Sequence, residues 1–393
     1  MKMTIINMDN MAGSHLDEKV IASMEPYFSF HYGNPSSSHD LGIATGKALN
    51  EAREKVAGLI SADADDIIFT SSATESNNLA LKGLAMAGRK KGNHIVTSAT
   101  EHFSILNPLK TLQKEGFTVT ILPVDNYGLI DPIALDKAIN DHTILVSIQT
   151  ANPEIGTIQT IDELAAIAIE RGVPFHTDAT AAAGWMPIDV KKTKISLLTL
   201  AGDQLNGPRG SAALYVKAGH RLQPLLEGGI QERGLRSGTE NVPAIVGFGE
   251  AAHLAQQSIH ERVKKMASVR DNLKESFFSE IPYLHINGHP EKRLPNNLNI
   301  SVQFVEGEAL LMRLNMAGIY VSSGSSCTSQ ALKASHVLTA IGVPPELAQG
   351  SLLFTLGVGN SLEEVPYVTA ELSKAAELLR NMSPLYQQFK KGE

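Results

Sequence analysis

Seven short runs rich in β-branched and aliphatic residues alternate with amphipathic stretches, and this alternation is the strongest constraint on the fold. The runs span residues 66–70, 93–99, 117–124, 143–149, 174–179, 195–201 and 211–216. Helix-period stretches such as ESNNLALKGLAMAGRKKG and TIDELAAIAIERG separate most of them. This pattern predicts an α/β fold, with a mostly parallel sheet covered by helices on both faces. We therefore expect functional residues in the loops at the carboxyl ends of the strands.

A second folding unit is expected, because 393 residues exceed what one ordinary hydrophobic core contains. The composition changes near residues 250–275, where a long helical segment lies. It is followed by the β-like pieces NNLNISVQF, GIYVSSG and GSLLFTLG, and by a last helix, LEEVPYVTAELSKAAELLRNM. These patterns predict a large domain over residues 14–258 and a smaller α+β domain built from residues 1–13 and 259–393.

Charge and composition argue against several classes of function. The net charge of -7 argues against a nucleic-acid surface, because such surfaces are usually basic. No apolar run approaches the length of a membrane span, and the N-terminal residues lack the apolar core of a signal peptide. The sequence therefore predicts a cytoplasmic protein without membrane contact. Cys327 is the single cysteine, so it forms no disulfide within the chain, and we expect no metal site.

Polar residues gather where predicted strands end. In FTSSATESNNLALKG, residues 69–83, a strand leads through a Ser/Thr-rich turn into a helix. Backbone N–H groups at a helix start, with hydroxyls such as that of Thr74, can bind a phosphate, although a plain capping turn explains the same residues. His102, Asn152 and Asp178 lie at or just past the ends of three other strands. For each alone a structural role is the simpler interpretation, but together they indicate a site at one edge of the sheet.

Nine short motifs add a resemblance to a known family. In chain order they are GNPSSSH, ATESNNLA, EH, EIGTIQ, HTDA, GPRG, RSGTENV, SSGSSCTS and SHVLTAIGV. On these motifs the chain resembles the NifS/IscS-like cysteine desulfurases of aminotransferase class V, from about residue 8 to about residue 385. The resemblance implies fold type I of the pyridoxal 5′-phosphate (PLP) enzymes, with a seven-stranded sheet in the large domain. It also implies a homodimer, L-cysteine as substrate, and an iron–sulfur scaffold or another sulfur acceptor as partner.

The resemblance assigns cofactor-binding roles to residues that match the motifs. His102 corresponds to the histidine that stacks on the cofactor ring, and Asp178 to the aspartate that pairs with the pyridinium nitrogen. Thr74 lies in the phosphate loop, and Asn152 lies near the ring hydroxyl and the substrate. Thr239 corresponds to the residue that reaches the phosphate of the partner subunit.

Cys327 and His102 are the expected catalytic residues. Cys327, in SSGSSCTS, corresponds to the cysteine that attacks the substrate sulfur and then holds a persulfide. The glycine and serine residues around it predict an exposed, movable loop. Its role does not require PLP, because a thiolate can accept persulfide sulfur from another donor or bind a soft metal or cluster. An ordinary small buried side chain is the alternative.

Five positions depart from the family pattern, and all fall in the expected catalytic centre. Aligned on GPRG, Gln204 replaces the lysine that binds the cofactor covalently, and Asp203 replaces a histidine that binds the phosphate. Ala201 replaces a serine, Ala181 replaces a glutamine that contacts the ring hydroxyl, and Val358 replaces the arginine that clamps the substrate carboxylate. An amide is not nucleophilic, and a carboxylate repels a phosphate unless it is protonated or paired. These departures predict non-covalent PLP, if any, and conventional turnover that is absent or very weak.

Three functions remain open on the sequence alone. The first is a cysteine desulfurase or close variant that transfers sulfur to Cys327 for iron–sulfur cluster or thiolation pathways; whole-chain resemblance favours it. The second is a non-catalytic paralogue, a persulfide acceptor, scaffold or partner of a cluster-assembly protein; the five departures favour it. The third is an enzyme with a different ligand in the former PLP cleft. The polar side chains of Asp203 and Gln204 favour this hypothesis.

Overall fold

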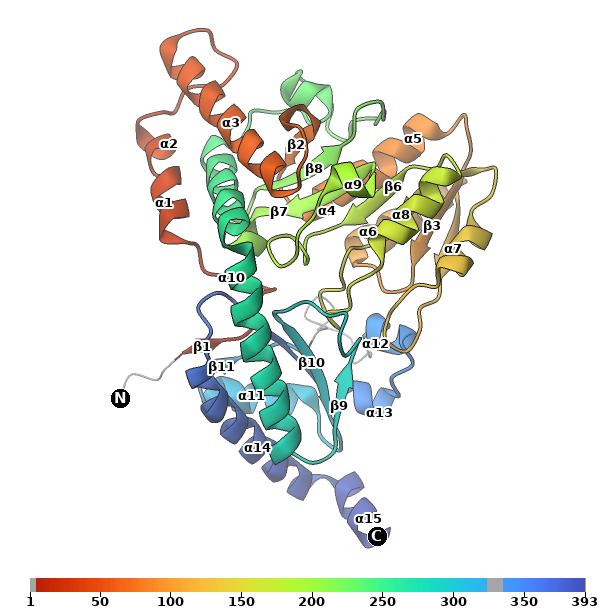
Figure 1. The fold of residues 1–393 in the computed structure, drawn as a ribbon, viewed down its shortest axis with the longest axis vertical. Coiled ribbons are helices and arrows are strands. Elements are labelled where there is room, and N and C mark those ends of the chain that lie inside the picture. Colours follow the sequence, from red (N-terminus) through yellow and green to blue (C-terminus); the bar gives the residue numbers. More distant parts are fainter. Residues whose placement is uncertain (1–4, 324–334, 393) are drawn as a thin grey trace.

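A seven-stranded sheet forms the larger part of the molecule (Figure 1). The computed structural model describes residues 5–323 and 335–392. The strands follow the order β2-β8-β7-β6-β5-β3-β4. They are β2 (Ile67–Thr70), β3 (His94–Ser98), β4 (Thr118–Leu122), β5 (Thr143–Ser147), β6 (Phe175–Asp178), β7 (Leu197–Ala201) and β8 (Ala212–Val216). Strand β8 is antiparallel to β2 and β7, and the other pairs are parallel. The predicted mostly parallel α/β sheet is therefore confirmed.

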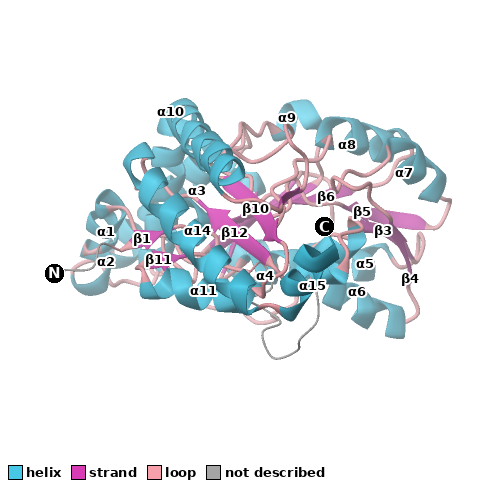
Figure 2. Ribbon diagram, turned by 90° about the horizontal axis from the view of Figure 1, so that it is seen from below, coloured by secondary structure: helices cyan, strands magenta, loops and turns pink. Residues whose placement is uncertain are grey.

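Helices cover both faces of this sheet (Figure 2). The helices are α3 (Asp40–Leu59), α4 (Ala73–Asn78), α5 (Leu84–Gly88), α6 (Phe103–Lys114), α7 (Pro132–Ala138), α8 (Ile161–Glu170), α9 (Val190–Thr193) and the long α10 (Val242–Glu280), with a π turn (Leu79–Gly83) joining α4 to α5. Successive side chains of a strand point to opposite faces. Phe69 and Leu198 accordingly pack in one core with α3, α8 and α10, whereas Ile68 and Leu197 pack in another with the π turn, α5 and α6.

A smaller antiparallel sheet forms the second part. Its strands are β12 (Ser351–Thr355), β10 (Asn297–Val302) and β9 (Leu284–Asn287), in that order. The N-terminal strand β1 (Ile6–Asn7) pairs with β11 (Ile319–Tyr320), which brings the chain start to this part. The remaining helices are α1 (Glu18–Met24), α2 (Pro26–Ser29), α11 (Gly307–Met316), α12 (His336–Ala340), α13 (Pro345–Ala348), α14 (Val365–Met382) and α15 (Pro384–Gly392). No helix of the described residues is both long and apolar enough to cross a membrane.

Helix α10 runs along both parts of the molecule, as Figure 1 shows. Phe248, in its first half, is buried in the core of the large sheet. Met266 and Phe277, in its second half, are buried in the core of the small sheet. The predicted domain boundary at residue 258 falls between these two groups and stays a prediction.

A buried ion pair holds the free edge of the large sheet at β2. The Glu232 carboxylate accepts hydrogen bonds from the backbone N–H of Phe69 at 2.7 Å and from both terminal nitrogens of Arg53 at 2.8 and 2.6 Å. The Arg53 guanidinium lies 4.7 Å from the centre of the Phe69 ring and also donates to the carbonyl of Ile67 at 2.7 Å. Glu232 takes the left-handed φ of 45°, a costly conformation for a side chain of this kind. It is the one buried residue in the fully described stretch 223–241, so this pair fastens that segment to the sheet.

Removing the Arg53 cation should destabilise the protein strongly. In Arg53→Met the Glu232 carboxylate, whose side chain is 1% exposed, stays buried without its partner, at a cost of about 3–5 kcal/mol. Arg171→Met removes a pair with Asp136 that is about half exposed, and should cost at most about 1 kcal/mol. Urea unfolding followed by the fluorescence of the single tryptophan, Trp185, compares the two. Equal losses in both variants would contradict the anchoring role of Glu232.

Candidate active site

The carboxyl ends of the parallel strands bring the predicted site residues to one edge of the large sheet. Asp178 is the last residue of β6, and His102 caps the start of α6 just after β3. Helix α4 starts just after β2. Gln204 lies in a 3-10 turn (Gly202–Leu205) directly after β7. These positions are the ones at which parallel α/β sheets bind their ligands.

A hydrogen-bonded chain connects Asp178 with His102. The Asn77 side-chain nitrogen Nδ2 donates to Asp178 Oδ2 at 2.7 Å and to Ser104 Oγ at 2.8 Å. Ser104 Oγ lies 2.7 Å from His102 Nδ1. Asn77, Ser104 and Asp178 are all buried. Sequence reasoning assigned no role to Asn77 or Ser104, and Asn77 lies in the uniformly polar run TESNN, residues 74–78, where nothing distinguishes it from its neighbours.

Asp178 offers a fixed carboxylate at this edge. Its Oδ1 accepts the backbone N–H of Thr180 at 2.9 Å, while Oδ2 accepts from Asn77. Asn152 is equally fixed, because its Nδ2 donates to the carbonyl of Thr100 at 2.9 Å. Asn152 Oδ1 accepts the N–H groups of Glu154 and Ile155 at 2.9 and 2.8 Å. The observed role of Asn152 is to shape the loop after β5, and its contact with a ring hydroxyl stays a prediction.

The predicted phosphate loop satisfies several of its own donors. Ser72 caps α4, since its Oγ accepts the N–H of Glu75 at 3.2 Å. The Glu75 carboxylate accepts from the N–H of Ser71 at 2.8 Å and from the Ser71 hydroxyl, and it pairs with Arg236 at 3.0 Å. Burial raises the pKa of Glu75, but the hydrogen bonds from Ser71 and Arg236 outweigh it and hold the pKa below its usual value. Thr74 is exposed at the start of this helix, which leaves it accessible to an anion.

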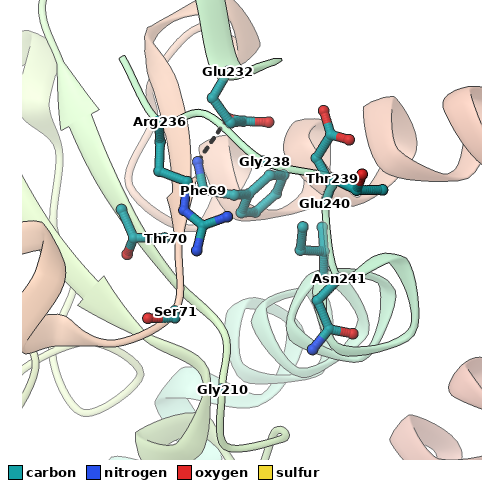
Figure 3. A pocket seen from close by; sticks show the side chains of 11 residues that line it. Phe69, Thr70, Ser71, Gly210, Glu232, Arg236, Gly238, Thr239, Glu240 and Asn241 are labelled. Atoms are coloured by element: carbon teal, nitrogen blue, oxygen red, sulfur yellow. Dashed lines mark hydrogen bonds between the residues drawn. The ribbon is translucent and has the colours of Figure 1, made fainter. Parts of the chain in front are cut away.

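A small pocket lies between this loop and the segment that contains Thr239 (Figure 3). Its volume is about 170 Å³, and Ser71, Glu232, Arg236 and Thr239 are among the residues that line it. Thr239 is exposed at this pocket. Its contact with a partner subunit's phosphate stays a prediction.

Two of the five departing positions are tied to the N-terminal segment. The Gln204 amide Nε2 donates to the carbonyl of Met11 at 2.9 Å. The carbonyl of Asp203 accepts from Ser14 Oγ at 2.5 Å. Burial raises the pKa of the Asp203 carboxyl, with Arg209 opposing that shift.

The other three departing positions lack polar side chains. Ala201 is buried at the end of β7, opposite Ala212 of β8. Ala181 packs in the small-sheet core with Trp185. Val358 is 39% exposed, and its carbonyl accepts from Lys265 Nζ at 2.7 Å.

Two buried carboxyls support the site loops. Glu101 accepts from Ser98 Oγ at 2.6 Å and from the N–H of Gln149 at 3.0 Å, and Glu154 accepts from Ser335 Oγ at 2.7 Å. One oxygen of each carboxyl has no hydrogen-bond partner among the described residues. Burial raises the pKa of both Glu101 and Glu154 to about 8, so both are mostly protonated at neutral pH.

His336 fastens helix α12 to the loop that contains Glu101, and His176 is held inside the sheet. His336 Nε2 donates to the carbonyl of Glu101 at 2.9 Å, and its ring lies 4.6 Å from that of Phe103. His176 is buried, with its ring nitrogens near Ser147 Oγ at 2.9 Å and Thr199 Oγ1 at 3.2 Å. Burial lowers the pKa of His176 to about 4, so this histidine is neutral.

Cys327 lies outside the described residues. Within residues 5–323 and 335–392, no three or more His, Cys, Asp or Glu side chains gather in a way that could hold a metal ion.

The residues at this edge fit the ring of PLP but not its usual covalent link. The Asp178 carboxylate can pair with a protonated pyridine nitrogen. His102 is connected to Asp178 by the hydrogen bonds through Asn77 and Ser104, and it is exposed. The Gln204 amide cannot form a covalent bond with the aldehyde of PLP, and it is already bonded to Met11.

The buried acids predict a fall in stability as the pH rises. The folded protein keeps protons on Glu101 and Glu154 that the unfolded chain releases above pH 4.5, so each group should lower the free energy of unfolding between about pH 4.5 and 8, by at most about 1.4 kcal/mol per pH unit. Glu101→Gln and Glu154→Gln should flatten the decline in melting temperature between pH 5 and 8. Glu75→Gln is the control. The pKa of Glu75 is lowered, so this group changes the free energy of unfolding only below about pH 4.5 and should not affect the slope between pH 5 and 8. An unchanged slope in both first variants would show that these carboxyls are ionised at neutral pH.

Comparison with known proteins places the chain in a family. The profile of the aminotransferase class-V family matches residues 6–368. The chain is 49% identical to the cysteine desulfurase IscS of Methanosarcina thermophila over 380 residues, which cover 97% of this chain and 94% of that protein. It is 48% identical to cysteine desulfurase IscS 1 of Archaeoglobus fulgidus, over 95% of this chain and 97% of that protein.

Solved structures give the same result. A NifS-like protein superposes with a TM-score of 0.90 at 35% identity, covering 96% of this chain and all of the other. A NifS-like protein from Rickettsia africae superposes with a TM-score of 0.86 at 30% identity, covering 95% of this chain and all of the other. The fold is therefore the NifS-like fold type I that the resemblance implied. The chain belongs to the aminotransferase class-V family and, within it, to the cysteine desulfurases of the IscS type.

Proposed function

We propose that this protein works in sulfur transfer for iron–sulfur cluster assembly, as a desulfurase relative that binds PLP without a covalent bond. The observation that supports this most is the contrast within one site. The chain from Asp178 through Asn77 and Ser104 to His102 is complete, while Gln204 donates its amide to Met11. When bound, PLP supplies an electron sink for chemistry at the α-carbon of an amino acid.

Nearby lysines are poorly placed to replace the missing one. Lys191 and Lys192 belong to α9, which precedes β7, so they lie at the amino end of that strand. The five residues of β7 span about 16 Å at the usual rise per residue. Lys191 also pairs with Asp63, at 2.8 Å. Conventional turnover should therefore be absent or very weak, since losing a positioned acid or base alone costs roughly 10²–10⁴-fold in rate.

A homodimer is part of the proposal. Large apolar side chains are exposed in two segments: Phe28, Phe30 and Tyr32 are 67–73% exposed, and Ile230 is 90% exposed. Exposed apolar patches are typical of protein–protein interfaces, and three large apolar side chains are exposed here within five residues, 28–32. Ile230 lies in the same segment as Thr239, so pairing there would bring Thr239 to the second subunit.

Restoring the lysine alone should not restore desulfurase activity. Gln204→Lys provides the amine, but position 203 still holds a carboxyl and position 358 still holds an apolar side chain. We expect this variant to form a covalent link with PLP. With L-cysteine and an added thiol that reduces the persulfide to sulfide, its rate of alanine and sulfide formation should nevertheless stay within about tenfold of that of the unmodified protein. The matched variant is Asp203→His, Gln204→Lys and Val358→Arg combined, which should exceed the single variant by at least about 10²-fold. Full turnover by Gln204→Lys alone would refute this account of the pocket.

The second candidate function is that of a sulfur acceptor without turnover of its own, which the five departing positions favour. In that case Cys327 should gain a persulfide from an active desulfurase supplied with L-cysteine, and the mass of the chain should rise by one sulfur atom. Cys327→Ser is the control and should show no added sulfur. Sulfur uptake that does not require PLP on this chain would favour the acceptor. No uptake from any donor, together with no turnover, would count against both functions.

A further inference from the structure

We propose that Ser104 and Asn77 are positioning residues that fix the tautomer of His102, with Nδ1 unprotonated and the ring proton on Nε2. They do this through a hydrogen-bonded chain in which every donor has a defined direction, from Asn77 through Ser104 to His102. The same Asn77 nitrogen also donates to Asp178, so the histidine and the carboxylate are held in one fixed relation.

The backbone of α6 decides the state of Nδ1. The N–H of Ser104 donates to His102 Nδ1 at 3.1 Å, because His102 is the N-cap residue of this helix. A backbone N–H can only donate, so the ring nitrogen that faces it must accept. A proton on Nδ1 would point at another proton. In the neutral imidazole the remaining proton therefore lies on Nε2.

The Ser104 hydroxyl strengthens this assignment. Its oxygen lies 2.8 Å from Asn77 Nδ2, which can only donate, so the oxygen accepts from Asn77. The hydroxyl proton is then free to point at His102 Nδ1, 2.7 Å away. Ser104 thus contributes two donors to one ring nitrogen.

The orientation of the Asn77 amide is fixed by Asp178. Nδ2 lies 2.7 Å from Asp178 Oδ2. Turning the amide over would place its oxygen against a carboxylate oxygen and against the Ser104 oxygen. In the observed orientation Asn77 Oδ1 is buried without a hydrogen-bond partner among the described residues. An unsatisfied buried oxygen is costly, so the contacts of Nδ2 must outweigh that cost.

The consequence for ligand binding rests on the proposed function. With PLP at the edge of the sheet, Asp178 would hold the ring nitrogen, and His102 would present Nε2–H as its one ring proton. The tautomer itself does not depend on PLP. It is a property of Ser104 and Asn77 in the unliganded chain, and it can be measured there.

The test is the nitrogen spectrum of the histidine rings. The full-length chain is labelled with ¹⁵N-histidine, and two-bond ¹H–¹⁵N correlations distinguish a protonated from an unprotonated Nδ1. His102→Gln identifies the His102 signals among those of the 13 histidines. The spectra are recorded for the unmodified protein, Ser104→Ala and Ser104→Thr, first without PLP and then with it.

The unmodified protein should show His102 mainly in the Nε2–H form, with the Nδ1–H form as the minor tautomer. Ser104→Ala keeps the backbone N–H but loses the hydroxyl, so the ratio of the two tautomers should shift about fivefold, which corresponds to one net hydrogen bond. Ser104→Thr keeps a hydroxyl and should restore the original ratio. The Nδ1–H form as the main tautomer of the unmodified protein, or equal ratios in the alanine and threonine variants, would overturn the proposal. If the tautomer is fixed but PLP leaves every signal unchanged, the proposal stands and PLP binding in the proposed function fails.

Discussion

The two hydrogen bonds that Asn77 donates are the contacts on which the arrangement of the site depends. One joins α4 to the end of β6 at Asp178, and the other joins α4 to the start of α6 at Ser104. Helix α4, the end of β6 and the start of α6 are thereby fixed to one another at the carboxyl edge of the sheet. Because Asn77, Ser104 and Asp178 are buried, the loss of any one of these three side chains leaves a buried donor or acceptor unsatisfied.

The other half of the site is organised differently. There the turn after β7 is bonded to residues 11–14 through Gln204 and Asp203, so its polar groups serve to hold the N-terminal segment. In the family this position provides the covalent bond to the cofactor. Under the proposed function, the site would combine a half that holds the PLP ring with a half whose polar groups hold the N-terminal segment. Loss of the covalent link, as proposed, would not require loss of the cofactor, since Asp178, His102 and the start of α4 are separate from Gln204.

The sequence predicts the sheet well because its strands are short, apolar and separated by helical patterns. The same reasoning misses β9, whose four residues, Leu284–Asn287, are mostly half-exposed and contain two polar side chains. Asp178 and His102 can be found from their positions at strand ends. Asn77 and Ser104 cannot be found in this way, because their roles come from contacts between distant parts of the chain. Asn77 and Asp178 are 101 positions apart, and Asn77 and Ser104 are 27 positions apart. Glu101 and Glu154 look like ordinary polar loop residues until their burial is known.

The most direct test of this account is the mode of PLP binding. The full-length protein is titrated with PLP, followed by absorbance, and one half of each sample is treated with borohydride before dialysis and mass measurement. We expect the absorbance of bound PLP to disappear on dialysis, and we expect no added mass after borohydride. Asp178→Asn should not show the absorbance of bound PLP. PLP trapped by borohydride on a lysine would contradict the central claim, because the covalent half of the site would then be functional.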